Sequence, residues 1–164
     1  MNIRTATPGD AEVIAGFNRI MAQETERLAL DPERLAAGVR AVLADPTKGI
    51  YYVAESGGFV VGQVMITYEW SDWRNGNIWW LQSVYVRPEF RGQGIFRALF
   101  KHVVVLAKQD RGVPALRLYM HSENGRARQC YENLGMSQTH YQVFEMDLLQ
   151  AQANADRKKM GVGR

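Results

Sequence analysis

Cysteine is almost absent from this chain of 164 residues, and the single one, Cys130, cannot form a disulfide within the chain. A chain without internal disulfides is typical of a reducing compartment, so the sequence predicts a cytoplasmic protein. No apolar run approaches the ~20 residues that a transmembrane helix needs, and the N-terminal residues lack the apolar stretch of a signal peptide. These absences disfavour a disulfide-stabilised secreted module and predict no membrane partner.

An excess of charge of one sign is also missing. The net charge is +3, and the 46% hydrophobic and 23% charged residues are ordinary for a soluble globular protein. Apart from a basic run near the C-terminus, cationic side chains gather only at Arg87, Arg91, Arg97, Lys101 and His102. That group suits either an anionic ligand or a solvated helix face. Without a basic face interleaved with aromatics, we expect no nucleic-acid partner.

Hydrophobic periodicity predicts one domain over residues 1–149, followed by a C-terminal tail at 150–164. The expected strands lie at residues 3–6, 50–55, 59–70, 78–86, 115–120 and 142–148. The expected helices lie at residues 10–21, 33–44, 93–110 and 125–134. Strands and helices in this order indicate an α/β (α+β layered) fold.

The strand at residues 78–86 ends at a proline and is followed by a glycine-containing loop and a helix. The loop carries Arg91, Gly92 and Gly94. Backbone N–H groups in such a loop can point into one small volume, and the helix N-terminus adds partial positive charge there. The pattern indicates a phosphate or pyrophosphate site, although an ordinary strand-to-helix turn uses the same glycines. The dinucleotide and P-loop glycine motifs are both absent.

A second segment follows the strand at residues 115–120. Asn124 occupies an N-cap position, and Gly135 is placed to end the same helix. Between them, Ala127 and Tyr131 lie four residues apart, on one helix face.

Together the two segments resemble the GNAT family of N-acetyltransferases. The family's acetyl-CoA loop, Arg/Gln-x-x-Gly-x-Gly/Ala, is matched from Arg91 to Phe96, with Phe96 in place of the small residue. Its later pattern, Asn-x-x-Ala-x-x-x-Tyr-x-x-x-Gly-Phe, is matched by Asn124, Ala127, Tyr131 and Gly135, with Met136 in place of Phe. The resemblance covers roughly residues 2–149 in element order and is specific within 78–136.

The resemblance implies a mixed sheet of about six to seven strands, splayed between its fourth and fifth strands and flanked by about four helices. It implies acetyl-CoA as co-substrate, no metal, and the amine of a small molecule or peptide as acceptor. The implied cofactor-binding residues are Val84, Tyr85 and Val86 for the pantetheine amides, as an added strand would bind, Arg91, Gly92, Gln93, Gly94, Ile95, Phe96 and Arg97 for the pyrophosphate, and Asn124 and Tyr131. Aromatic residues near the expected cleft suit a core, an acceptor pocket or the contact of a homodimer.

Acetyl transfer to an amine needs a group that accepts a proton and a group that donates one. In the family, a tyrosine at the position of Tyr131 points at the cofactor sulfur, and a phenol with a pKa near 10 is protonated at neutral pH. Tyr131 is therefore the predicted general acid, with a packed aromatic side chain as the structural alternative. Glu69 is the predicted base, with Asp72 and His121 as alternatives; solvated surface groups would look the same in the sequence.

These residues predict an acyltransferase that moves an acetyl group from acetyl-CoA to a primary amine. The alternative is a catalytically silent module that binds acetyl-CoA and regulates a partner. The presence of Tyr131 argues against a silent module.

Overall fold

The computed structural model describes residues 1–148. These residues belong to two compact units, residues 1–129 and the residues from Cys130 onward, so the single domain predicted for residues 1–149 stays a prediction. The α-helices and strands in chain order are β1 (Asn2–Thr5), α1 (Ala11–Glu26), α2 (Pro32–Ala44), β2 (Ile50–Ser56), β3 (Phe59–Ser71), β4 (Gly76–Val86), α3 (Ile95–Gln109), β5 (Leu116–Arg117) and α4 (Gly125–Asn133). Short 3-10 turns precede α1 (Pro8–Asp10) and follow β4 (Pro88–Phe90). No helix among residues 1–148 combines the length and apolar character needed to cross a bilayer.

The sheet is mixed and runs in the order β1-β2-β3-β4-β5. All neighbours are antiparallel except β4 and β5, which are parallel as a strand–helix–strand connection requires. The α/β fold class and the four helices are confirmed. Five strands form among the described residues, where about six to seven were expected.

The segment expected as a final strand, residues 142–148, is not a strand in this structure. Residues 142–147 have no regular secondary structure, and Val143 and Phe144 are 72% and 91% exposed. The apolar alternation that predicted the strand is present. A strand also needs a neighbour that pairs with its backbone, and none does so among residues 1–148.

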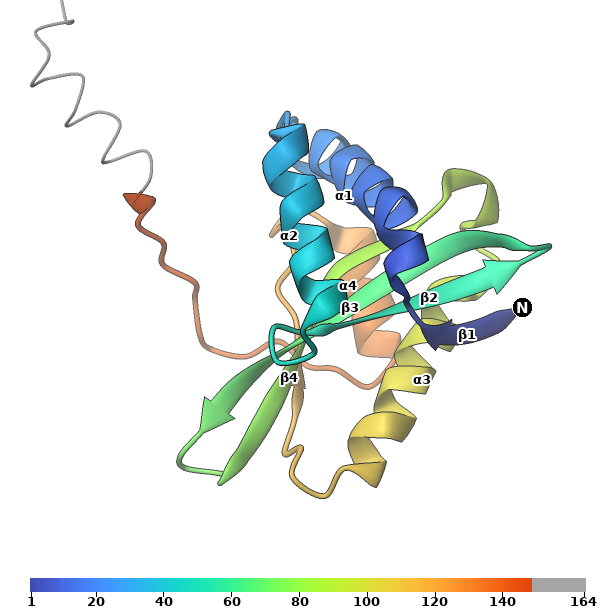
Figure 1. Cartoon of the computed structure of the whole chain (residues 1–164). Coiled ribbons are helices and arrows are strands. Elements are labelled where there is room, and N and C mark those ends of the chain that lie inside the picture. Colours follow the sequence, from blue (N-terminus) through green and yellow to red (C-terminus); the bar gives the residue numbers. More distant parts are fainter. Residues whose placement is uncertain (149–164) are drawn as a thin grey trace, which may run out of the picture. The chain divides into compact units, whose positions relative to one another are not determined.

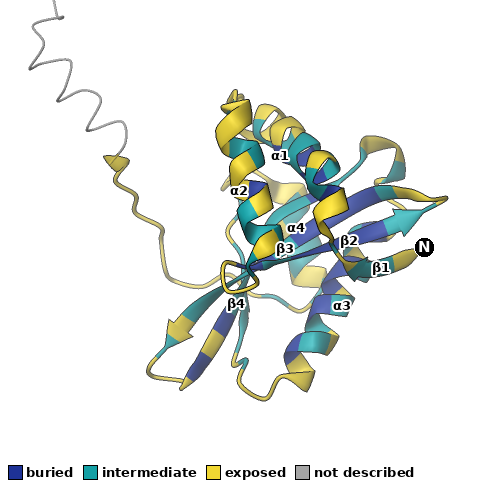
Figure 2. Ribbon diagram, in the orientation of Figure 1, coloured by how far each residue is buried: buried dark blue, intermediate teal, exposed yellow. Residues whose placement is uncertain are grey.

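Helices cover both faces of the sheet in residues 1–129, with α1 and α2 on one face and α3 on the other (Figure 1). On the first face, Ile14 of α1 and Val39 of α2 pack in one buried cluster with Tyr51 and Val53 of β2. On the other face, the ring of Tyr52 meets the ring of His102 on α3 at 5.1 Å. Burial is concentrated in the central strands (Figure 2), which makes this sheet the rigid platform for the candidate site.

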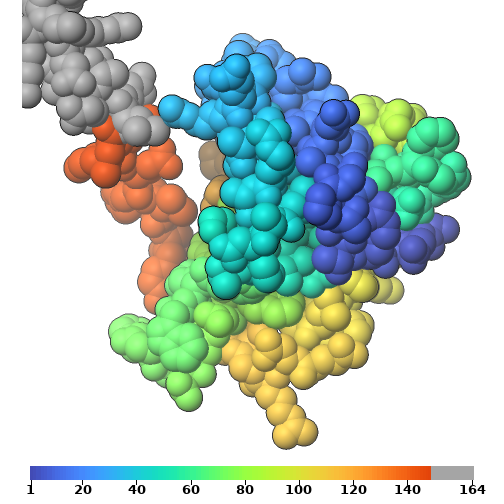
Figure 3. All heavy atoms as spheres, in the orientation of Figure 1, coloured from blue at the N-terminus to red at the C-terminus, as the bar shows by residue number. Residues whose placement is uncertain are grey.

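The β3–β4 hairpin projects from the body of the molecule beside the loop that precedes β5 (Figure 3). Its turn uses Asn75 in a left-handed conformation, with φ of 48°. At Gly76 a Cβ would overlap the carbonyl oxygen of Gly112, so this close approach needs a glycine. The N–H of Asn77 donates to that same oxygen at 3.1 Å, which anchors the loop to β4.

Asp10 occupies the N-cap position of α1, but its side chain does not cap that helix. Its carboxylate accepts hydrogen bonds from both Nη atoms of Arg4 at 2.8 and 2.9 Å and from the N–H of Thr7 at 2.7 Å. The Arg4 hydrogen bonds are the main cause that lowers the pKa of Asp10 to about 2. This ion pair fastens β1 to the start of α1, which begins at Ala11.

Candidate active site

The edge of β4 that faces β5 is paired over a short distance. β5 was expected over residues 115–120 but pairs only through Leu116 and Arg117, opposite Trp79 and Trp80. β4 continues to Val86, and no strand of the described residues pairs with Leu81–Val86 on that side. An extended ligand that carries amide groups can add to such an edge as a further strand does. The predicted residues Val84, Tyr85 and Val86 lie within it.

β4 also contains a β-bulge. Gln63 of β3 is opposite Tyr85, and Met65 is opposite Gln82, so one residue of β3 faces the two residues Ser83 and Val84. Ser83 has a φ of 49°, which places a non-glycine residue in the left-handed region. The bulge disturbs the β3–β4 ladder beside the free edge.

The predicted glycine loop joins β4 to α3. Gly92 and Gly94 have φ values of 78° and 81°, so both positions favour glycine. A Cβ at either would meet no described atom within 4 Å, which leaves the loop open to a ligand. The N–H of Ala98 donates to the oxygen of Gly94, and the backbone N–H groups at the start of α3 precede this first helical bond. Loop and helix start thus have the form of an anion site.

Gly62 of β3 sets the position of this helix start. A Cβ there would lie 3.0 Å from Cγ2 of Ile95 and 3.2 Å from the oxygen of Tyr85. The first residue of α3 therefore packs closely against β3 and β4. Phe96, the departure from the family pattern, packs its ring 6.1 Å from the ring of Phe100 on the same helix.

The side chain of Arg91 reaches toward α1. Its guanidinium contacts Glu24 at 2.8 Å, its Nε donates to the oxygen of Val86 at 2.9 Å, and it lies 5.5 Å from the centre of the Tyr85 ring. Arg91 was predicted among the residues of the pyrophosphate loop. The contact with Glu24 connects that loop to the C-terminal turn of α1.

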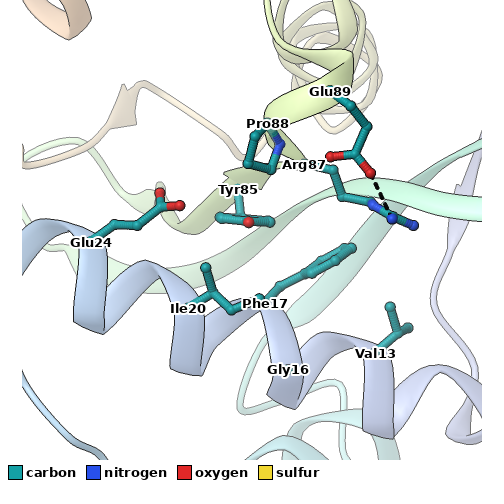
Figure 4. A pocket seen from close by; sticks show the side chains of 9 residues that line it. All are labelled: Val13, Gly16, Phe17, Ile20, Glu24, Tyr85, Arg87, Pro88 and Glu89. Carbon is teal, nitrogen blue, oxygen red and sulfur yellow. Dashed lines mark ion pairs between the residues drawn. The ribbon is translucent and has the colours of Figure 1, made fainter.

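A pocket of about 420 Å³ lies between α1 and the end of β4 (Figure 4). The rings of Phe17 and Tyr85 lie against each other at 4.8 Å in it. Arg87 and Glu89 form an ion pair at 2.6 Å at its edge. Its lining residues are Val13, Gly16, Phe17, Ile20, Glu24, Tyr85, Arg87, Pro88 and Glu89. Since Tyr85 also belongs to the free edge, the pocket and the edge share one residue.

Glu69, the predicted base, is held by two donors. Its Oε2 accepts from Nε1 of Trp80 at 2.5 Å, and its Oε1 accepts from Nη1 of Arg117 at 3.0 Å. The carboxylate thus connects β3, β4 and β5. It is opposite Ile78, three residues before the free edge begins at Leu81, or roughly 10 Å along the strand.

The alternative bases, Asp72 and His121, are exposed residues in turns. Oδ1 of Asp72 accepts from the N–H of Trp73 at 2.9 Å, in the tip of the β3–β4 hairpin. Nδ1 of His121 lies 3.4 Å from the N–H of Glu123, which donates to it. Neither hydrogen bond distinguishes a catalytic side chain from a turn residue.

The predicted start of α4 is confirmed. Oδ1 of Asn124 accepts from the N–H of Ala127 at 3.0 Å, as an N-cap does. The side chain of Asn124 is therefore used by the helix. Its predicted contact with the cofactor stays a prediction.

The predicted end of α4 is also confirmed. Gly135 is left-handed with φ of 86°, and the N–H of Met136 donates to the oxygen of Tyr131 at 3.0 Å. Tyr131 is half-buried, and this burial is the main cause that raises the pKa of its phenol. A raised pKa keeps the hydroxyl protonated at neutral pH, as a proton donor must be.

A buried polar group beneath β4 was not predicted from the sequence. Asn18 and Gln63 are 7% and 0% exposed, and Nε2 of Gln63 donates to Oδ1 of Asn18 at 2.7 Å. The available signal was a glutamine inside the apolar run of β3, between Gly62 and Val64.

Comparison with known proteins identifies a family for this chain. The acetyltransferase (GNAT) family model matches residues 17–136. Thialysine N-epsilon-acetyltransferase of Bos taurus is 40% identical over 79 residues, which are 48% of this chain and 45% of that protein. The matched region is thus less than half the length of this curated relative.

Solved structures resemble the chain over most of its length. A possible acetyltransferase from Clostridium difficile 630 is 44% identical, with a TM-score of 0.84 over 90% of this chain and 97% of that one. A predicted acetyltransferase from Clostridium acetobutylicum, whose structure was solved with acetyl-CoA, has the same fold at 20% identity, with a TM-score of 0.72 over 91% of this chain and 97% of that one. The chain belongs to the acetyltransferase (GNAT) family.

Proposed function

We propose that this protein is an N-acetyltransferase that moves an acetyl group from acetyl-CoA to a primary amine of a small molecule or peptide. The observation that carries the proposal is continuity: the free edge of β4 leads, through one short turn, into a left-handed glycine pair at the N-terminus of α3. An edge for amides followed by a cradle for an anion matches the two ends of a pantetheine–pyrophosphate chain.

The chain's own groups supply the binding. Backbone groups of Val84, Tyr85 and Val86 would hold the pantetheine amides, and backbone N–H groups from Gly92 to Arg97 would hold the pyrophosphate. Bound acetyl-CoA supplies the activated acetyl group as a thioester. Orientation by backbone groups on a rigid sheet then brings the acceptor amine and the acetyl carbon together.

Proton transfer needs two further groups. Tyr131 is the proposed general acid, because it stands at the tyrosine position of the family motif and its phenol, whose pKa burial raises, is protonated at neutral pH. Glu69 is the proposed base. Since Trp80 and Arg117 already hold its carboxylate, and roughly 10 Å separate it from the free edge along the strand, we propose that it acts through a chain of water molecules.

Acetyl-CoA turnover with a panel of amines tests the function. The rings of Phe17 and Tyr85 favour an acceptor with an apolar body, so arylalkylamines belong in the panel with thialysine, amino acids and peptides. We expect release of free thiol that depends on one class of amine. Tight binding of acetyl-CoA without amine-dependent thiol release would contradict the proposal and support a silent regulatory module.

Replacing Glu69 by Gln tests the base. Glutamine retains one oxygen that can accept from Trp80, but it replaces the oxygen that accepts from Arg117 at 3.0 Å with a donor and cannot take up a proton at working pH. We expect kcat/KM to fall by ~10²-fold, with a flattened acidic limb in its pH profile and unchanged acetyl-CoA affinity.

Arg117→Met is the matched control, because it removes a partner of Glu69 but keeps the carboxylate. It should lower the thermal midpoint and retain an acidic limb in the pH profile, displaced toward higher pH because a cation beside the carboxylate is lost. If Glu69→Gln also changes only the thermal midpoint, Glu69 is a structural brace and the base lies elsewhere.

A further inference from the structure

A chain of hydrogen-bonded polar side chains crosses the core from β2 to β4. Nδ2 of Asn18 on α1 donates to the hydroxyl oxygen of Tyr51 on β2 at 3.0 Å. Nε2 of Gln63 on β3 donates to Oδ1 of Asn18 at 2.7 Å and to the carbonyl oxygen of Ser83 at 3.1 Å. A carbonyl oxygen can only accept, so this contact fixes which end of the Gln63 amide faces β4. The series of hydrogen bonds therefore ends at Ser83, a residue of the β4 bulge.

Ser83 needs support to remain as it is. At φ of 49° it occupies the left-handed region, which disfavours residues other than glycine, asparagine and aspartate. Such residues persist where the surroundings hold them, and they cluster at functional sites. Gln63 is the side chain whose hydrogen bond reaches the backbone of Ser83.

The bulge decides which side chains of β4 face α1. Gln63 and Met65 of β3 point to the same face, and so do their partners Tyr85 and Gln82. Because Tyr85 and Gln82 are three residues apart, the two-residue alternation of β4 is reversed between them. Without the bulge, the side chain of Tyr85 would leave the face of α1 and the pocket that it lines.

A contribution to the stability of the fold does not by itself explain why Gln63 is polar. Gln63 is fully buried, and its Oε1 has no hydrogen-bond partner among residues 1–148. An unsatisfied buried acceptor is unfavourable, and an apolar side chain of similar size would remove it. A glutamine at this position is better explained by a requirement for one particular backbone conformation.

We propose that Gln63 is a positioning residue which, with Asn18 and Tyr51, holds Ser83 in its left-handed conformation and so maintains the free edge of β4 and the orientation of Tyr85. Only the expected effect on acetyl-CoA binding rests on the proposed function. The support of the bulge is a property of the protein without ligand.

A double-mutant cycle between Gln63→Met and Ser83→Gly tests the proposal. Gln63→Met should weaken acetyl-CoA binding at least tenfold in calorimetry and speed amide hydrogen exchange in residues 82–86 without ligand. Glycine adopts a positive φ unaided, so Ser83→Gly alone should bind nearly as the unmodified protein does, and the double variant should recover most of the affinity.

Two further variants separate positioning from general destabilisation. Val53→Ala removes fully buried volume from β2 away from β4, and it should lower the thermal midpoint without faster exchange in residues 82–86. Asn18→Leu removes the acceptor on α1 but keeps Gln63, and it should act as Gln63→Met does with a smaller effect; it serves also if Gln63→Met fails to fold.

Unchanged exchange in residues 82–86 of Gln63→Met, or of Asn18→Leu in its place, would overturn the inference. So would a double variant that binds no better than Gln63→Met. Faster exchange together with an unmodified protein that binds no acetyl-CoA would instead refute the proposed function and leave the support of the bulge standing.

Discussion

Replacing Gly94 by aspartate is expected to lower the affinity for acetyl-CoA by well over tenfold, which corresponds to more than ~1.4 kcal/mol. Gly94 lies at the start of α3, and a side chain there would extend into the open loop. A carboxylate in that space would repel a pyrophosphate and compete for the same N–H groups. Isothermal titration calorimetry measures the effect directly.

Gly94→Asn is the matched control for this substitution. Asparagine is close in size to aspartate and tolerates the φ of 81° about as well, so both variants share the conformational cost of roughly 1 kcal/mol or less. They differ by one negative charge. We expect the asparagine variant to bind acetyl-CoA more tightly than the aspartate variant. Equal affinity of Gly94→Asp and the unmodified protein would remove the loop from the proposed site.

Tyr131→Phe is expected to lower kcat by ~10²-fold or more with acetyl-CoA affinity nearly retained. The substitution keeps the ring and removes only the hydroxyl. Burial raises the pKa of Tyr131, so the neutral donor persists above the ordinary value near 10. The unmodified enzyme should therefore lose no activity through Tyr131 ionisation between pH 7 and ~10.

Tyr119→Phe is the control for the loss of a hydroxyl, because Tyr119 is 64% exposed. It should leave kcat unchanged. If Tyr131→Phe lowers the thermal midpoint strongly while turnover per folded molecule stays intact, the hydroxyl is structural, and the proposed proton donor is wrong while the acetyl-CoA site stands. A loss of less than tenfold would show that solvent or the substrate ammonium supplies the proton.

Local features of the site could be predicted from the sequence because few residues determine them. The two glycines of the loop have positive φ values, as expected where side chains are disfavoured. Asn124 caps α4 and Gly135 ends it, since each acts on backbone groups within a few residues. The left-handed turn at Asn75 depends on similar short-range chemistry.

Strand pairing was predicted less well. The apolar patterns of residues 115–120 and 142–148 are typical of strands. Of the residues in these two segments, only Leu116 and Arg117 pair with another strand. Periodicity records which face of a segment is apolar. It does not record whether another strand lies beside it with free backbone groups.

The sequence by itself determined the family, the glycine loop and the order of the elements from β1 to α4, because these depend on spacings within short segments. The tertiary structure alone decided that Gln63 reaches Ser83, 20 residues away in sequence, and that Arg91 reaches Glu24, 67 residues away. It also decided that β4 carries a bulge that turns Tyr85 toward α1. Contacts across such distances form only when the sheet and helices have packed, so no local pattern encodes them.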